Sequence, residues 1–238
     1  MKKTLLGLYA AVTVLLMFWG YYQAIYVAPD ESTMHEIQRI FYYHVPSAMV
    51  AFSFFAISLA GSIGFLTYRR TRPDWAQISD AWALAGAEVG IVFCTIVLIT
   101  GPLWGRRAWG IWWTWDARLT TYLLLWLLYV SYLLLRQFSA MGQTAMVSAV
   151  LAIFAAVDIP ICYMSIRWWR TQHPAPVFGG GADSGIDPGM YAAVWWNLAG
   201  WAMWGAFVLG LRYAIERRRQ RQSEADALGF LSEAPEAR

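Results

Sequence analysis

The sequence is poor in charged residues. Only 14% of its 238 residues are Asp, Glu, Lys or Arg, whereas soluble domains have about 25%. No stretch matches G-x-x-x-x-G-K-[ST], which excludes ATP hydrolysis by the P-loop route. No series of short segments with alternating polarity occurs, which argues against a membrane β-barrel. Because 59% of the residues are hydrophobic, we expect lipid to be the main solvent of this chain.

Cysteine and histidine are also scarce. Cys94 and Cys162 lie within apolar runs and have no C-x-x-C spacing, so no redox pair or zinc site of that type is predicted. We expect both to be small buried hydrophobic residues. The three histidines, His35, His44 and His173, all fall outside the apolar runs.

Six apolar runs are long enough to cross a hydrocarbon core of about 30 Å as helices. Helices are expected because lipid offers no partner to an open backbone. The sequence therefore predicts an all-α, polytopic membrane protein with six transmembrane helices, forming one domain over residues 1–238. We expect the first run to be a retained helix, because Tyr26-Val27-Ala28 is not an A-x-A cleavage site. The six predicted spans are Leu5–Ala28, Pro46–Tyr68, Asp80–Thr100, Leu119–Leu135, Ala145–Met164 and Tyr191–Leu211.

The basic residues predict the orientation of these spans. With the N-terminus in the cytoplasm, 12 of the 18 Lys and Arg residues lie inside and 6 lie outside, as the positive-inside rule requires. Both termini are then cytoplasmic, and the segments 29–45, 101–118 and 165–190 face outward. The cytoplasmic tail, from about residue 213 to residue 238, begins with an arginine cluster that favours anionic lipid. Its last part, from Ser223 to Arg238, is expected to be mobile.

Two polar residues within the spans are unusual. Glu88 lies in the middle of the third span, where a carboxylate is costly, so we expect it to contact protein and not lipid. Asp158 precedes Pro160, which has no N–H, so the fifth helix is expected to break there. In the third outward segment, the run Gly179-Gly180-Gly181 predicts a mobile loop and not a phosphate site.

The second outward segment concentrates five of the fifteen tryptophans in twelve residues. One or two per helix end would suffice for an interfacial aromatic belt. In a helix, several of these rings would share one face, and two glycines, Gly105 and Gly110, would allow close backbone approach. The pattern favours a flat aromatic platform for a planar hydrophobic ligand, although an aromatic belt alone is the plainer alternative. The tryptophans are Trp104, Trp109, Trp112, Trp113 and Trp115.

His44 and His173 are 129 residues apart, yet both lie at the predicted outer surface. Neutral imidazole is a good iron ligand, so two such residues could bracket one haem iron, although a lone interfacial histidine is usually structural. Arginine suits the carboxylates of haem propionates. The arginines available on this face are Arg39, Arg106, Arg107, Arg118, Arg167 and Arg170.

Three segments together resemble a known family. Trp104-Gly105, Trp109-Gly110, Trp112-Trp113 and the run from Trp115-Asp116 through Arg118 to Thr120 resemble the WWD motif of haem-handling proteins. The segments around Arg39–Ser47 and Trp168–His173 resemble the flanking histidine loops of the CcmC (haem exporter protein C) branch. The resemblance runs from about Arg39 to Tyr213.

The resemblance implies a non-catalytic subunit of the cytochrome c maturation complex in the bacterial inner membrane. Such a subunit holds haem b as transient cargo at the periplasmic face and presents it to the haem chaperone CcmE. His44 and His173 match the axial ligands of the haem iron, and the WWD segment matches the haem platform. His35 matches no position of the family. The implied partners are CcmE, the ATPase CcmA and the membrane subunits CcmB and CcmD, besides lipid; we expect no nucleic-acid partner.

Other functions remain open at this level. A cytochrome c haem lyase of the same WWD family is the main alternative, but larger members usually carry histidines in mid-membrane, which this chain lacks. An electron-transfer cytochrome b would also place paired histidines within its spans. A haem-translocating transporter would need a polar path through the bilayer, and none is evident.

Overall fold

The computed structural model describes residues 2–138, 144–178 and 185–233. In these ranges the regular structure is helical, and six helical segments are long and apolar enough to cross a membrane. The six predicted spans are therefore confirmed: the first is shifted by one residue, and each of the other five lies within a longer helical segment. The segments are Thr4–Val27, Glu36–Tyr68, Pro73–Trp109, Ala117–Phe138, Thr144–Trp168 and Pro188–Gly229.

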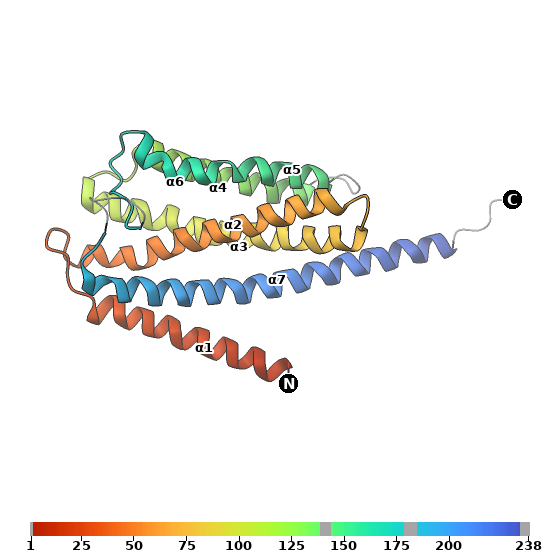
Figure 1. The fold of residues 1–238 in the computed structure, drawn as a ribbon, viewed down its shortest axis with the longest axis horizontal. Helices are drawn as coiled ribbons and strands as arrows, with labels where there is room; N and C mark the ends of the chain where they lie inside the picture. The colour runs from red at the N-terminus through yellow and green to blue at the C-terminus, as the bar shows by residue number, and fades with distance from the viewer. Residues whose placement is uncertain (1, 139–143, 179–184, 234–238) are drawn as a thin grey trace.

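The helices lie side by side in an elongated bundle, with α2 and α3 between the α4–α6 group and α7, and with α1 outside α7 (Figure 1). One end carries the connections 28–40 and 110–116 and the segments 169–178 and 185–190, and we call it the cavity end. The opposite end carries the N-terminus and the last part of α7, and we call it the tail end. The helices are α1 (Lys2–Tyr22), α2 (Phe41–Tyr68), α3 (Pro73–Trp109), α4 (Ala117–Phe138), α5 (Thr144–Ala156), α6 (Asp158–Trp168) and α7 (Tyr191–Glu233), with short turns at Gln23–Val27, Glu36–Ile40 and Pro188–Met190.

The closest helix pair is α2 and α3, and glycines make the approach possible. A Cβ atom at Gly61 would lie 2.6 Å from the backbone of Ala83, and one at Gly86 would lie 2.8 Å from the carbonyl oxygen of Phe54. Small residues at such contacts let helix backbones pack directly in a membrane. Beside this contact, the rings of Phe55 and Tyr129 stack with centroids 3.8 Å apart. Helices α2 and α3 thus form the centre on which α4, α5 and α7 pack.

The helix ends follow local sequence signals. Pro73 begins α3, where its missing N–H costs nothing, and Gly110 ends it with a left-handed φ of 78°. The predicted break in the fifth span is confirmed, since α5 ends at Ala156 and α6 begins at Asp158, two residues before Pro160. Cys94 and Cys162 are fully buried and free, as predicted. Gly179-Gly180-Gly181 lies outside the described residues.

Two helix boundaries differ from the sequence prediction. His44 lies in a helix and not in a loop, because α2 begins at Phe41, where the fully buried Tyr42 extends the packed helix beyond Pro46. Helix α3 continues to Trp109, well into the segment predicted to lie outside. The connections at the cavity end are consequently shorter than predicted.

The tail after the last span is helical, because α7 runs without interruption to Glu233. Its 43 residues correspond to about 65 Å at 1.5 Å per residue, roughly twice the hydrocarbon thickness. Good helix formers, mainly Arg, Gln, Glu, Ala and Leu, continue the helix beyond the apolar part. The last five residues lie outside the described ranges.

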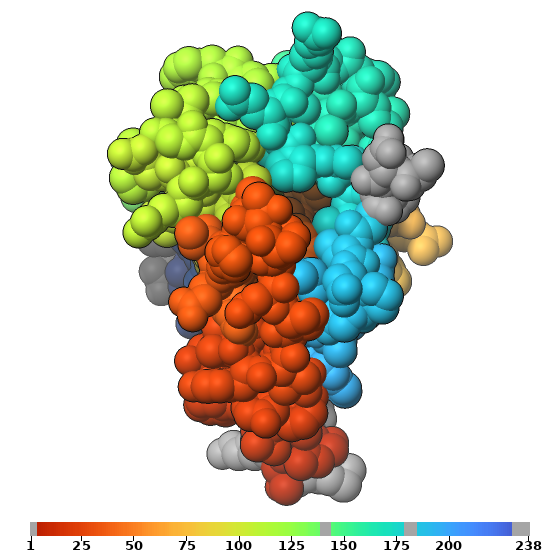
Figure 2. Space-filling model, turned by 90° about the vertical axis from the view of Figure 1, so that its left-hand side faces the viewer, coloured from red at the N-terminus to blue at the C-terminus, as the bar shows by residue number. Residues whose placement is uncertain are grey.

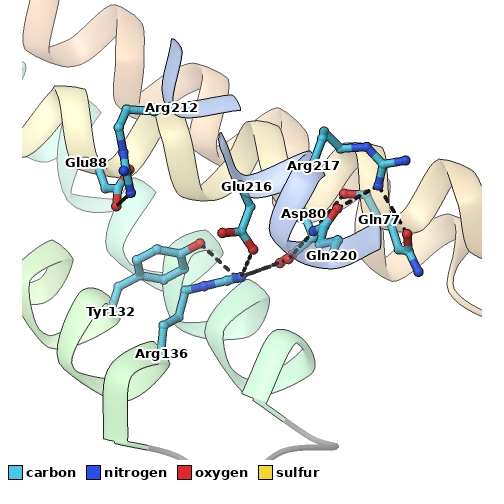
Figure 3. A network of polar contacts seen from close by, with 9 residues as sticks. All are labelled: Gln77, Asp80, Glu88, Tyr132, Arg136, Arg212, Glu216, Arg217 and Gln220. Carbon is cyan, nitrogen blue, oxygen red and sulfur yellow. Dashed lines mark hydrogen bonds and ion pairs between the residues drawn. The ribbon is translucent and has the colours of Figure 1, made fainter. Parts of the chain in front are cut away.

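Charged residues join α3, α4 and α7 towards the tail end (Figure 3). Arg136 of α4 contacts both carboxylate oxygens of Asp80 at 2.5 and 2.8 Å and lies 3.9 Å from the carboxylate of Glu216. Separately, Arg212 binds both oxygens of Glu88 at 2.6 and 2.5 Å. The prediction that Glu88 contacts protein is confirmed, although its side chain keeps 24% exposure.

Candidate haem site

A cavity of about 1000 Å³ opens at the cavity end of the bundle. Figure 2 looks onto this end and shows a hollow between the yellow-green segment around α3 and α4, the teal connection after α6, and the orange segment after α1. Apolar side chains of α2, α3 and α4 form much of its wall, including Ala48, Phe52, Val97 and Leu119. The volume lies in the range of small-molecule and cofactor sites.

The structure brings His44 and His173 together at this cavity. His44 reaches it from the first turns of α2, and His173 from the connection after α6. The two imidazoles are close enough to interact electrostatically. Residues 129 positions apart thus line one cavity, as the sequence predicted.

Hydrogen bonds orient both rings in the same way. His44 Nδ1 lies 2.8 Å from the Thr100 hydroxyl, and His173 Nδ1 lies 2.9 Å from the carbonyl oxygen of Pro174. A carbonyl only accepts, so Nδ1 of His173 carries the proton. Its Nε2 then keeps a lone pair, which is what an iron ligand needs.

The charge state of His173 also suits ligation. Burial, the larger cause, and the positive charge of Arg118 lower the pKa of His173 to about 4, although the hydrogen bond to Pro174 opposes both effects. The lowered pKa keeps the imidazole neutral at ordinary pH, and the neutral form is the one that donates to a metal.

Four of the five tryptophans line the cavity: Trp104, Trp109, Trp112 and Trp113. Trp104 and Trp109 meet edge to face with centroids 5.1 Å apart. The prediction of a shared helical face is wrong for the last two rings, because α3 ends at Trp109 and the turn at Gly110 carries Trp112 and Trp113 to the cavity instead. Trp115 is not among the cavity-lining residues, is 76% exposed, and meets the ring of Trp113 edge to face.

Two features of this wall suit a large planar ligand with polar groups. A Cβ atom at Gly105 would lie 3.1 Å from the ring of Trp109, so this glycine makes room for that ring. The Nε1–H of Trp113 is buried and has no acceptor among the described residues. A buried donor without a partner is costly, and a carboxylate or carbonyl of a ligand would satisfy it.

The charged members of the predicted site separate into three roles. Arg118 lines the cavity, donates to the carbonyl oxygen of Cys162, and is the one arginine or lysine among the described lining residues. Asp116 accepts from the backbone N–H of Leu119 at 3.0 Å and so caps α4, which places Arg118 on the first turn. Arg39 binds Asp30 at 2.7 Å and backbone carbonyls after α1, so it ties two connections together and does not line the cavity.

The structure adds residues that sequence reasoning missed. Thr100 holds the His44 ring from α3, and Met34 lines the cavity from the connection before α2. A threonine in an apolar helix has no sequence signal for this role, because its partner lies 56 positions away. His35, left as a surface residue, is exposed.

Known proteins of similar sequence belong to one family. A family profile described as "Heme exporter protein C" (CcmC) matches residues 1–226. Heme exporter protein C of Bradyrhizobium diazoefficiens is 37% identical over 177 residues, which cover 74% of this chain but only 65% of that relative. The protein of the same name from Escherichia coli is 30% identical over 223 residues, covering 90% of this chain and 86% of the relative. The Rhodobacter capsulatus protein is 29% identical over 216 residues, with 89% and 86% covered. The chain belongs to the haem exporter protein C (CcmC) family.

Proposed function

We propose that this protein holds haem b as transient cargo at the periplasmic face of the inner membrane and presents it to the haem chaperone CcmE. It acts as a non-catalytic subunit in cytochrome c maturation, together with the ATPase CcmA and the membrane subunits CcmB and CcmD. The observation that carries this proposal is the cavity in which two histidines, four tryptophans and one arginine meet. Relatives that are 37% and 30% identical to this chain are named heme exporter protein C.

The cavity residues fit haem in three respects. His44 and His173 supply neutral nitrogen ligands for the iron. The tryptophan rings supply flat apolar surface for the macrocycle. Arg118 supplies positive charge, and Trp113 an unpaired N–H, for a propionate. Of the six arginines considered from the sequence, Arg118 is thus our candidate for the propionate contact.

The alternative of a haem lyase receives no support from the histidines. His35, His44 and His173 are the only histidines of the chain, and all three lie near the cavity end. A second haem-binding centre in mid-membrane would lack histidine ligands. We therefore favour haem presentation over haem attachment.

The four cavity-lining tryptophans, Trp104, Trp109, Trp112 and Trp113, form what we call the tryptophan wall, and its role can be tested with a matched pair of variants. Trp113→Ala removes a ring that lines the cavity, and we expect it to lower haem co-purification and transfer to CcmE by about tenfold, since stacking and burial of one large ring contribute one to two kcal/mol or more. Trp115→Ala removes the neighbouring ring, which meets Trp113 edge to face but does not line the cavity, and should leave both readouts near the wild-type level. The measurement is haem absorbance per protein after purification with the partner subunits. An equal loss of bound haem in the two variants would contradict a specific role of the cavity-lining tryptophans.

The orientation follows from the arginine bias and can be tested by fusions. We expect both termini to be cytoplasmic and the cavity end to be periplasmic. A reporter that is active only in the periplasm should give no signal when fused after Arg238, and a clear signal when inserted after Gly180 in the connection before α7. The reverse pattern would overturn the proposed periplasmic site.

A further inference from the structure

Thr100 stands out because it touches a proposed iron ligand but not the cavity itself. Its hydroxyl lies 2.8 Å from His44 Nδ1 and 2.7 Å from the carbonyl oxygen of Ile96, one helical turn earlier. A hydroxyl has one proton to donate and two lone pairs to accept with. The two contacts can therefore coexist in one arrangement: the hydroxyl donates to Ile96 and accepts the Nδ1–H of His44.

We infer that Thr100 is a positioning residue that selects the tautomer of His44 in which Nε2 keeps its lone pair toward the cavity. This inference rests on the proposed function, because a free Nε2 lone pair matters here only if His44 is an axial haem ligand. Metal-bound histidines generally donate their second N–H to a fixed acceptor, which sets the tautomer and the ring orientation. Here the acceptor is a side-chain hydroxyl whose own proton is committed to the α3 backbone.

The cavity beside the ring holds a cation and several carboxylates. Arg118 lines it and acts electrostatically on His44, so an N–H directed at this cation would be unfavourable. Trp113 Nε1 in the cavity wall is a donor, whereas Asp30, Glu31 and Asp187 could accept, so the tautomer assignment rests on the Thr100 contact. A Cβ atom at Gly101 would lie 3.3 Å from His44 Cε1, so the glycine after Thr100 gives the ring its room.

The two histidines are therefore held by different means. The Nδ1–H of His173 binds the backbone carbonyl of Pro174, which no substitution at position 174 removes. The Nδ1–H of His44 depends on one side chain, which a single substitution can remove. Thr100 is thus the place where one of the two ligands can be altered without touching either ligand or the cavity wall.

The matched variants are Thr100→Val, Thr100→Ser and Thr95→Val. Valine keeps the shape of threonine without the hydroxyl, and serine keeps the hydroxyl. Thr95 is the control on the same helix: its hydroxyl donates to the carbonyl oxygen of Ile91 at 2.8 Å and accepts from Trp126 Nε1 at 2.9 Å, away from His44. Loss of a helix-bonded hydroxyl as such would affect both valine variants.

The first measurement needs no haem. With three histidines in the chain, ¹⁵N labelling of histidine and NMR of the haem-free protein in lipid nanodiscs report each tautomer, with His44→Asn to assign the signal. We expect wild type, Thr100→Ser and Thr95→Val to show the Nδ1–H form at His44, and Thr100→Val to shift it toward the Nε2–H form. An unchanged His44 tautomer in Thr100→Val would overturn the inference.

The second measurement links the tautomer to haem. Thr100→Val should weaken haem binding by about 10- to 100-fold, the usual effect of removing such a partner, and Thr100→Ser should restore most of it. A shifted tautomer with unchanged haem affinity would overturn the positioning role alone. If His44→Ala itself kept the two-nitrogen haem spectrum, the proposed ligand would fail instead, and the haem-free tautomer result would still decide whether Thr100 orients this ring.

Discussion

Replacing either His44 or His173 by Ala is expected to abolish the low-spin, two-nitrogen spectrum of the haem-loaded protein. Each variant should become high-spin or lose haem, because one axial nitrogen is gone while the tryptophan wall remains. Both rings line the same cavity and interact electrostatically, so the loss should be similar from either side. The measurement is the visible spectrum of the protein purified with its partner subunits.

Added imidazole sharpens this experiment. It can enter the space left by the removed ring and should restore part of the low-spin spectrum in either alanine variant. The control is His35→Gly, because His35 is exposed and has φ 51° and ψ −133°, a backbone conformation that suits glycine. This control should keep the wild-type spectrum. If both alanine variants kept it too, the two-histidine assignment would be wrong and the tryptophan wall alone would have to account for binding.

Replacing Arg136 by Met is expected to destabilise the bundle by roughly 3–5 kcal/mol, the usual cost of leaving buried charges without their partner. The side chains of Arg136, Asp80 and Glu216 are only 14%, 9% and 11% exposed. The arginine meets Asp80 with two parallel contacts and also lies 5.7 Å from the ring centre of Tyr132. Its loss would leave two carboxylates facing each other in a place with little water.

Related variants separate charge from geometry at this site. Arg136→Lys keeps the charge but not the planar fork, so it should lie between wild type and Arg136→Met. Adding Asp80→Asn and Glu216→Gln to Arg136→Met should recover much of the loss, because the stranded charges are then removed. Arg218→Met, which removes an exposed arginine of α7, should have little effect. Denaturation of the protein in detergent gives the free energies of unfolding, and a wild-type value for Arg136→Met would show that the buried charges do not need their cation.

The charged group also has a place in the fold that the sequence does not reveal. Arg136 lies near the end of α4, whereas Arg118 lies on its first turn at the cavity. Helix α4 is therefore attached at one end to α3 and α7 and carries a cavity residue at the other (Figures 1 and 3). Destabilised Arg136 variants are consequently expected to lose haem as well, but imidazole should not rescue that loss.

The sequence by itself determined the class of the molecule and the chemistry it carries. Lipid offers no hydrogen-bond partner to an open backbone, so six apolar runs of about twenty residues predict six helices. The break in the fifth span follows from the missing N–H of Pro160. The crowding of tryptophan between Trp104 and Trp115, with three histidines near one predicted surface, favoured a planar hydrophobic ligand, and the resemblance of these segments to the WWD family indicated haem. These predictions were possible because each pattern lies within a short stretch of sequence or depends only on which segments lie at the membrane surface.

Only the tertiary structure decided which members of the motif meet and how they are held. Trp112 and Trp113 reach the cavity because Gly110 ends α3 there, whereas Trp115 does not line it, and no periodicity distinguishes them. Arg39 and Arg118 look alike as free cations in the sequence, but packing binds the first to Asp30 and directs the second to the cavity. The Thr100 and Arg136 contacts join residues 56 positions apart, because hydrogen bonds and ion pairs between helices depend on which faces pack together, and that is settled only when the helices assemble.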